Sequence, residues 1–203
     1  MISRILLPAV FLDRDGVLVK EKGYITTFEQ MEIYPYAANC ITKLNENGWL
    51  CFMVTNQSAV ARGMLTEKKL QEIHDCLCKH LNEQQAFLDA AYYCPHLPLL
   101  EGEDNILPYR RYCSCRKPNI GMIERAQSQY RIDMSRSFII GDRESDIMLG
   151  YNAGLTTILV RTGYGLTDYK EKTIQPDYIF DSLVEAVEFI INADRNQKDL
   201  AGG

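Results

Sequence analysis

No run of apolar residues in this 203-residue sequence approaches the ~18 that a membrane-spanning helix needs. Positive charge is not in excess either: the net charge of −5 argues against broad binding to nucleic acids or anionic membranes. The apolar start of the chain contains Pro8 and runs into Asp13 and Asp15 without the small-residue cleavage site of a signal peptide. We therefore expect a cytoplasmic protein that binds neither nucleic acid nor membrane.

Internal repeats and low-complexity segments are also absent, and the composition is that of a globular protein. Hydrophobic residues make up 46% of the chain and charged residues 24%, which excludes a mainly disordered chain. The seven cysteines are an odd number for a disulfide framework, so reduced thiols, some of them holding a metal, are expected. We expect a monomer with one domain over residues 1–194 and a flexible tail over residues 195–203.

Apolar runs alternate with helical patterns along the whole chain. Strands are predicted at residues 9–12, 49–54, 90–93, 137–140, 157–160 and 178–180. Helices are predicted at residues 36–47, 122–130 and 146–152, and two more begin at Thr66 and Ser182. Because the strands are apolar throughout rather than alternating, both faces of their sheet should be covered. The prediction is an α/β fold, a Rossmann-like three-layer sandwich around a mostly parallel sheet.

Acidic and polar residues come directly after three of the predicted strands. In a parallel sheet, these strand ends lie at the same edge. These segments are residues 13–16, 55–58 and 141–146. Ligands bind at such ends in open parallel sheets, and Lys117 could join them from the loop before the helix that follows it. Clustered carboxylates at a sheet edge favour a hard cation such as Mg²⁺, which leaves room for phosphates. Two carboxylates spaced by one residue, Asp13 and Asp15, allow one to attack while the other moves protons.

The order and spacing of these segments resemble the four motifs of the haloacid dehalogenase (HAD) superfamily. The matching segments are residues 11–18 (FLDRDGVL), 54–57 (VTNQ), 116–118 (RKP) and 141–143 (GDR). No large insertion follows Gly16, so no separate cap domain is expected. The resemblance implies a phosphatase that works through an aspartyl-phosphate. Its implied catalytic residues are the nucleophile Asp13, the acid and base Asp15, and the phosphoryl-binding Thr55 and Lys117; Mg²⁺ would be held by Asp13, the backbone carbonyl of Asp15, and Asp142.

Three cysteines and one histidine form a separate pattern. Cys94 and His96 are followed, after sixteen residues, by Cys113 and Cys115, which gives the Cys₃His set of a structural zinc site. Unrelated buried cysteines are the alternative, and a zinc-dependent nucleic-acid binder is a weaker one because no basic recognition helix follows. Zinc would fix the long loop over residues 94–115 and thereby the positions of Arg116 and Lys117.

Two further patterns indicate structure rather than a site. His74 and Cys78 lie one helical turn apart and could bind a metal, but helix packing is the favoured interpretation. Residues 163–165 (GYG) resemble a phosphate-binding loop only superficially and predict a turn, because no lysine and helix follow them in the required pattern.

The zinc loop narrows the resemblance to the heptose-bisphosphate and histidinol-phosphate phosphatases. Residues 21–24 (EKGY), 55–63, 92–96 and 161–163 are similar to the heptose-specific members, whereas Ala59 and Arg143 depart from them, Arg143 toward the histidinol-phosphate pattern. The resemblance implies removal of the 7-phosphate from a heptose 1,7-bisphosphate, in nucleotide-activated heptose synthesis for surface polysaccharide. Histidinol-phosphate phosphatase is the alternative, and a non-catalytic phosphometabolite binder is a lower one. The implied substrate contacts are Glu21, Lys22, Gly23, Tyr24, Asn56, Gln57, Ser58, Arg62, Arg116 and Arg143.

Charge supplies an independent reason to expect a sugar bisphosphate. A second phosphate needs a second cationic patch, and arginine is suited to bidentate phosphate binding. Candidate cations in or beside the rim loops are Lys20, Lys22, Arg62, Arg116 and Arg143. Histidinol phosphate carries an ammonium group instead, for which Glu21 or Glu144 could serve.

Overall fold

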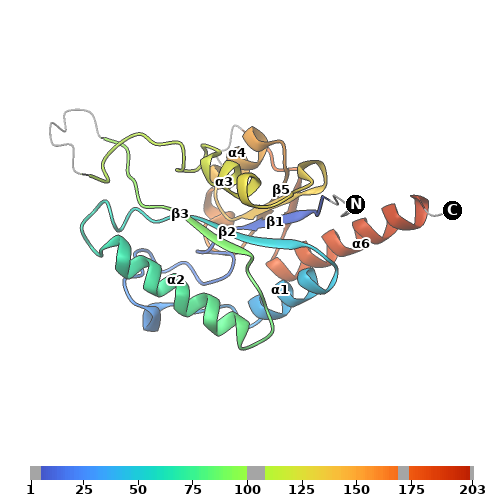
Figure 1. Cartoon of the computed structure of the whole chain (residues 1–203), viewed down its shortest axis with the longest axis horizontal. Coiled ribbons are helices and arrows are strands. Elements are labelled where there is room, and N and C mark those ends of the chain that lie inside the picture. The colour runs from blue at the N-terminus through green and yellow to red at the C-terminus, as the bar shows by residue number, and fades with distance from the viewer. Residues whose placement is uncertain (1–5, 100–107, 169–173, 202–203) are drawn as a thin grey trace.

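Six parallel strands form one sheet at the centre of the molecule (Figure 1). The structure is a computed structural model that describes residues 6–99, 108–168 and 174–201. The strands are β1 (Ala9–Leu12), β2 (Leu50–Asn56), β3 (Ala90–Cys94), β4 (Phe138–Gly141), β5 (Thr156–Val160) and β6 (Tyr178–Phe180). Their order is β3-β2-β1-β4-β5-β6, with every neighbouring pair parallel. The strand order reverses direction between β1 and β4, and ligands bind at such points in open α/β sheets.

Helices cover both faces of this sheet, which confirms the predicted three-layer sandwich. They are α1 (Ala37–Glu46), α2 (Glu67–Asn82), α3 (Gly121–Gln129), α4 (Glu144–Ala153), α5 (Gly165–Asp168) and α6 (Leu183–Ala201), with single 3₁₀ turns at Phe28–Gln30 and Met134–Arg136. Helices α1, α2 and α6 pack on one face, and α3 and α4 pack on the other (Figure 1). The described residues between β1 and α1 form no separate cap domain, as expected.

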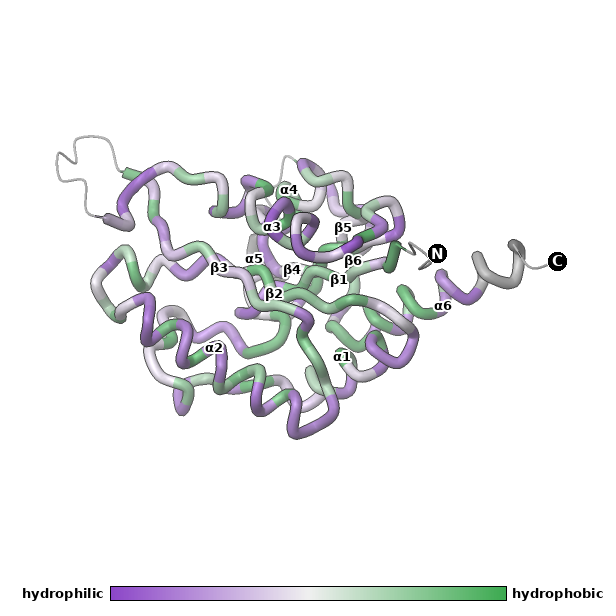
Figure 2. Tube along the Cα trace, viewed as in Figure 1, coloured by the Kyte–Doolittle hydropathy of each residue, from purple (hydrophilic) through white to green (hydrophobic). Residues whose placement is uncertain are grey.

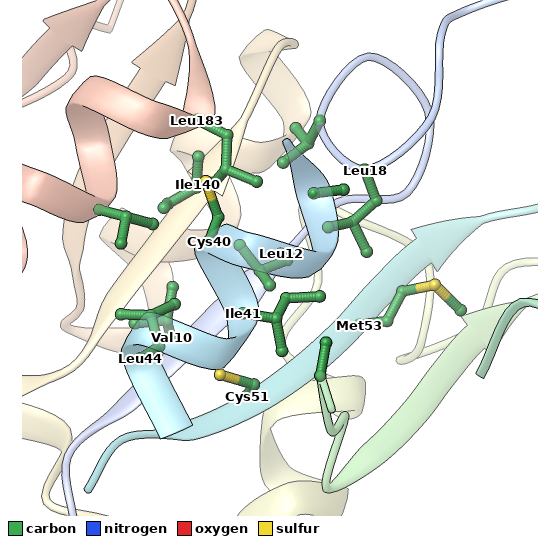
Figure 3. Close-up of a cluster of buried hydrophobic side chains, with 14 of the residues drawn as sticks. Val10, Leu12, Leu18, Cys40, Ile41, Leu44, Cys51, Met53, Ile140 and Leu183 are labelled. Atoms are coloured by element: carbon green, nitrogen blue, oxygen red, sulfur yellow. The ribbon is translucent and has the colours of Figure 1, made fainter. Parts of the chain in front are cut away.

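The continuous apolar character of the strands has a direct cause in this packing. Val10 and Leu12 of β1 point toward α1, whereas Ala9 and Phe11 point toward the opposite layer, and all are fully buried. Figure 3 shows the first layer, in which Cys40, Ile41 and Leu44 of α1 lie against the side chains of the strands. Hydrophobic residues accordingly concentrate along the central strands in Figure 2. Burying one such large side chain stabilises the fold by about 1.5–3 kcal/mol.

Two helix boundaries differ by more than one residue from the sequence-based predictions. Helix α4 begins at Glu144 rather than at Asp146, because the Asp146 carboxylate accepts a hydrogen bond (3.1 Å) from the backbone N–H of Arg143 and caps an earlier turn. Helix α6 continues to Ala201, whereas a tail was expected from residue 195. No proline or glycine interrupts the chain from Leu183 to Ala201, so nothing local stops the helix before Gly202. None of the described helices has the length and apolarity needed to cross a membrane.

A glycine in α4 allows that helix to lie directly on the sheet. A Cβ atom at Gly150 would collide with the side chains of Ile139 in β4 and Thr157 in β5. We therefore expect Gly150→Ala to lower the free energy of unfolding by about 1–3 kcal/mol, although alanine is the better helix former. Urea denaturation measures this, with Tyr151→Ala, at an exposed neighbouring position, as the control that stays within about 0.5 kcal/mol of the wild type. Equal stability of the two variants would contradict the close packing.

Candidate active site

Loops at the carboxyl edge of the sheet enclose a cavity of about 440 Å³. The cavity collects most of the residues predicted from the sequence for chemistry or substrate binding. Those that line it are Asp13, Asp15, Glu21, Gly23, Tyr24, Thr55, Asn56, Gln57, Ser58, Arg62, Arg116, Lys117 and Arg143. Leu97, Ser145 and Tyr164 complete the lining and were not predicted.

A buried ammonium group lies at the base of the site. The Nζ atom of Lys117 is 2.8 Å from Oδ1 of Asp13 and 2.6 Å from Oδ1 of Asp146, and it donates a hydrogen bond to the backbone carbonyl of Val54. Burial alone would lower the pKa of Lys117, but the charges of Asp13 and Asp146 outweigh it and raise that pKa. Lys117 is therefore a fixed positive charge beside Asp13.

Asp146 is a site residue that the sequence analysis missed. It is fully buried in the first turn of α4; its Oδ1 forms the ion pair with Lys117, and its Oδ2 accepts a hydrogen bond from the backbone N–H of Arg143. The sequence does contain a pattern that could have identified Asp146, because Asp142 and Asp146 are four residues apart just after a predicted strand. Residues 141–146 were expected at the sheet edge, but Asp146 itself was expected only to begin a helix.

Asp142 lies behind the cavity wall, completely buried. Its Oδ2 atom accepts a hydrogen bond (2.7 Å) from the backbone N–H of Tyr164, whereas its buried Oδ1 has no hydrogen-bond partner among the described residues. A Cβ atom at Gly16 or at Gly163, both with positive φ, would collide with this carboxylate. The predicted turn at residues 163–165 is thus part of the site: it leads into the short helix α5 and supplies the donor to Asp142.

Among the described residues, negative charge is in excess in this cluster. Oxygen atoms of Asp13, Asp142 and Asp146 lie within 4.8 Å of one another, and Lys117 pairs with only two of these carboxylates, those of Asp13 and Asp146. Burial, together with the charges of Asp13 and Asp146, raises the pKa of Asp142. A divalent cation would balance the cluster and give the unpartnered Oδ1 of Asp142 a partner. The oxygen donors present therefore fit a hard cation such as Mg²⁺.

Asp15 belongs to a second, separate set of contacts. Its Oδ2 accepts hydrogen bonds from Gln57 Nε2 (2.9 Å) and Arg14 Nη2 (2.8 Å), and Oδ1 accepts from Arg14 Nε and Nη2. Gln57 Nε2 also donates to Thr55 Oγ1 at 2.9 Å. Because the Thr55 hydroxyl oxygen accepts this bond, its own proton remains available to a ligand in the cavity.

Asn56 holds the backbone on either side of Lys117. Its Oδ1 accepts from the Lys117 N–H (3.0 Å), and its Nδ2 donates to the Lys117 carbonyl (3.2 Å). Lys117 is in this way fixed to the end of β2. Asn56 also lines the cavity, and its contact with substrate stays a prediction.

Three arginines line the cavity, namely Arg62, Arg116 and Arg143. Arg143 donates to Glu21 (3.1 Å), and its guanidinium lies 3.9 Å from the centre of the Tyr164 ring. The guanidinium of Arg62 lies 5.3 Å from the centre of the Tyr24 ring. Of the predicted substrate contacts, Lys22 does not line the cavity; its ammonium pairs with Glu32 on the surface at 2.7 Å.

The four predicted zinc ligands come together. The sulfur atoms of Cys94, Cys113 and Cys115 are 3.2–3.5 Å apart, and Nδ1 of His96 lies 3.3 Å from Cys115 and 3.6 Å from Cys94. A tetrahedral zinc site with Zn–S bonds of about 2.3 Å has ligand atoms about 3.8 Å apart, so this cluster needs little expansion to hold the ion. Burial raises the pKa of the Cys94 thiol, and zinc would have to displace its proton.

The cluster is connected to the cavity through Arg116. The Nη1 atom of Arg116 donates a hydrogen bond (3.0 Å) to the backbone carbonyl of His96. In the same segment, Tyr109 donates to Glu67 at the start of α2 (2.8 Å). Residues 100–107 of the predicted loop lie outside the described residues.

A parallel α/β sheet with acidic groups directly after β1 and β4, a threonine near the end of β2 and a buried lysine beside them defines a hydrolase of the haloacid dehalogenase class. The family described as HAD-hydrolase-like matches residues 114–186. A D-glycero-D-manno-heptose-1,7-bisphosphate 7-phosphatase from Thermosynechococcus vestitus is 42% identical over 187 residues, which cover 90% of this chain and 95% of the relative. A D-glycero-beta-D-manno-heptose-1,7-bisphosphate 7-phosphatase from Escherichia coli (strain K12) is 33% identical. That match covers 91% of this chain and 94% of the relative.

Solved structures agree with these sequence relatives. The crystal structure of D,D-heptose 1,7-bisphosphate phosphatase from B. bronchiseptica, complexed with magnesium and phosphate, has a TM-score of 0.79 and 26% sequence identity. That match covers 92% of this chain and 99% of the other. The chain therefore belongs to the family of the D-glycero-D-manno-heptose-1,7-bisphosphate 7-phosphatases within the HAD-like hydrolases.

The charge imbalance of the site predicts a measurable response to magnesium. Mg²⁺ should raise the melting temperature of the wild type, because a cation that binds only the folded state adds about 2.7 kcal/mol at 100 times its Kd. Asp142→Asn should fold without metal, since it removes one of three clustered charges, but lose most of this Mg²⁺ response. Thermal melts with and without Mg²⁺ measure the effect, with Asp75→Asn, on the exposed face of α2, as the control. An undiminished response in Asp142→Asn would contradict the metal assignment.

Proposed function

We propose that this protein is a magnesium-dependent phosphatase that removes the 7-phosphate of D-glycero-D-manno-heptose 1,7-bisphosphate. The observation that carries the proposal is the Asp13 carboxylate, held by Lys117 at the cavity beside Asp15. The two sequence relatives described above align with 90% or more of the chain and are named for this reaction. The product, a heptose 1-phosphate, suits the synthesis of nucleotide-activated heptose for surface polysaccharide.

In the first half of the reaction, Asp13 attacks the phosphorus atom. Lys117 and the backbone N–H of Arg14 both hold Oδ1 of Asp13, which leaves Oδ2 as the attacking oxygen. As the new bond from Oδ2 to phosphorus forms, the bond from phosphorus to the sugar oxygen breaks, and that oxygen takes a proton from the carboxyl group of Asp15. The Thr55 hydroxyl and the Lys117 ammonium stabilise charge on the phosphoryl oxygens.

The second half of the reaction releases phosphate. Asp15, now a carboxylate, accepts a proton from a water molecule while the water oxygen attacks the phosphorus of the aspartyl-phosphate. The bond between phosphorus and Asp13 then breaks, which restores the Asp13 carboxylate. Asp13, Asp142 and the backbone carbonyl of Asp15 would hold Mg²⁺, which supplies further positive charge to the phosphoryl group when bound.

The second phosphate of the substrate requires cations away from Lys117. Among the described residues, no carboxylate pairs with Arg62 or Arg116, both of which line the cavity. These two arginines are the proposed contacts for the remaining phosphate. For histidinol phosphate, the alternative substrate, an acidic partner for the ammonium would be needed, and Glu21 is already occupied by Arg143.

We further propose that the Cys₃His cluster holds a structural zinc ion whose effect on catalysis is indirect. The support is the arrangement of Cys94, His96, Cys113 and Cys115 around one point and the hydrogen bond from Arg116 to His96. A cytoplasmic monomer that binds neither nucleic acid nor membrane also stays part of the proposal.

Phosphate release from heptose 1,7-bisphosphate and from histidinol phosphate, measured side by side with Mg²⁺, tests the substrate and the nucleophile. The wild type should prefer the bisphosphate strongly. Asp13→Asn should lower kcat by about 10⁴-fold or more, because the attacking oxygen is lost, whereas the exposed Asp75→Asn should be unchanged. Preference for histidinol phosphate would overturn the substrate assignment. Residual activity of Asp13→Asn near the wild-type level would overturn the mechanism.

Cys113→Ser tests the zinc proposal. Loss of one thiolate should lower the bound zinc measured by metal analysis and raise KM for the bisphosphate about 10-fold, because Arg116 loses its fixed anchor. Cys76→Ser, which replaces an exposed cysteine of α2, should keep both zinc content and KM. A Cys113→Ser protein with full zinc content and full activity would rule the proposal out.

A further inference from the structure

Arg14, between the two acids of the first motif, points away from the cavity and into the protein. It is completely buried, and its guanidinium contacts both oxygens of the Asp15 carboxylate through Nε and Nη2 at 2.8–3.1 Å. Asp15 itself keeps 14% of its side-chain surface exposed at the cavity. The guanidinium is therefore a support behind the carboxylate rather than a ligand for substrate.

A histidine of α2 holds the other end of this guanidinium. Nε2 of His74 lies 3.1 Å from Nη1 of Arg14, and the imidazole is completely buried beside the ring of Tyr93. Burial, with the positive charge of Arg14, lowers the pKa of His74 to about 3, so the ring is neutral. Because an arginine can only donate, the neutral Nε2 is the acceptor, and the chain of contacts runs from α2 through Arg14 to Asp15.

Packing alone does not account for a buried arginine at this place. An apolar side chain of similar volume would fill the same space without the cost of burying a charge. Among the described residues, the carboxylate that balances Arg14 is Asp15 alone. A buried guanidinium that depends on one carboxylate also fixes the position of that carboxylate, since any displacement would leave the charge unpaired.

We propose that Arg14 and His74 are positioning residues for Asp15: His74 orients the guanidinium, and the guanidinium orients the carboxyl group toward the leaving oxygen. The inference rests on the proposed phosphatase function and assigns a use to two side chains that the mechanism above leaves without one. The reaction rate depends most on the position of Asp15 when the leaving oxygen needs a proton. A sugar alkoxide needs it, whereas 4-nitrophenolate departs unprotonated.

The test compares these two leaving groups in variants of His74. His74→Leu removes the acceptor, and His74→Gln retains one at the same distance along the side chain. With heptose 1,7-bisphosphate, whose leaving group is a sugar alkoxide, His74→Leu should lower kcat about 10- to 100-fold. With 4-nitrophenyl phosphate, kcat should fall less than about 3-fold, and KM should change little for both substrates. His74→Gln should recover most of the loss. Ile73→Val, a buried change on the same helix, is the control that should show no preference between the esters.

If His74→Leu does not fold, Arg14→Lys gives the same comparison, because lysine keeps the charge but lacks the bidentate geometry. Equal losses with both esters would assign His74 a purely structural role and overturn the inference while leaving the phosphatase function intact. No loss with either ester in a folded His74→Leu protein would overturn it as well. Failure of the wild type to hydrolyse either ester would overturn the proposed function together with the inference.

Discussion

The buried ammonium of Lys117 is the interaction on which the rest of the site depends. It joins Asp13, at the end of β1, to Asp146 in the first turn of α4, and it also donates to a backbone carbonyl of β2. Three segments that are distant in the sequence therefore meet at one positive charge. Burying these groups costs free energy, so the apolar layers on both faces of the sheet must support them. The site lowers the stability of the fold, and the hydrophobic core offsets this loss.

The two acids of the first motif belong to different electrostatic surroundings although one residue separates them. Asp13 shares Lys117 with a cluster that has an excess of negative charge, which suits a metal-bound nucleophile. Asp15 is paired with Arg14 and so forms a balanced unit that has no need of a metal charge. Gln57 donates to both Asp15 and Thr55, which connects the proposed proton-transferring group to the proposed phosphoryl-binding hydroxyl. The two carboxylates proposed as nucleophile and acid are thus distinguished by the cation that each contacts, Lys117 for Asp13 and Arg14 for Asp15.

The sequence predicted the fold and the centre of the site because both depend on local patterns. Apolar runs identified the strands, and polar residues just after them had to converge once the sheet was parallel. The sequence could not predict the direction in which each side chain points. Nothing in the order of residues shows that Arg14 points into the core, or that Lys22 turns outward to Glu32, which lies near it through the bridge between Val19 and Ile33. Asp146 was missed because a helix start and a site residue have the same local signature.

Loops rather than a cap domain carry the cations of this cavity, so each arginine needs its own anchor. Arg116 is anchored to the backbone of His96 within the cysteine cluster, and Arg143 by Glu21 and the ring of Tyr164. Because Glu21 balances the charge of Arg143, this residue adds little net positive charge for a phosphate. Its planar guanidinium can stack on Tyr164, which an ammonium group cannot do in the same way. Compared with a lysine, Arg143 thus changes how the rim is held together more than the charge a bisphosphate meets.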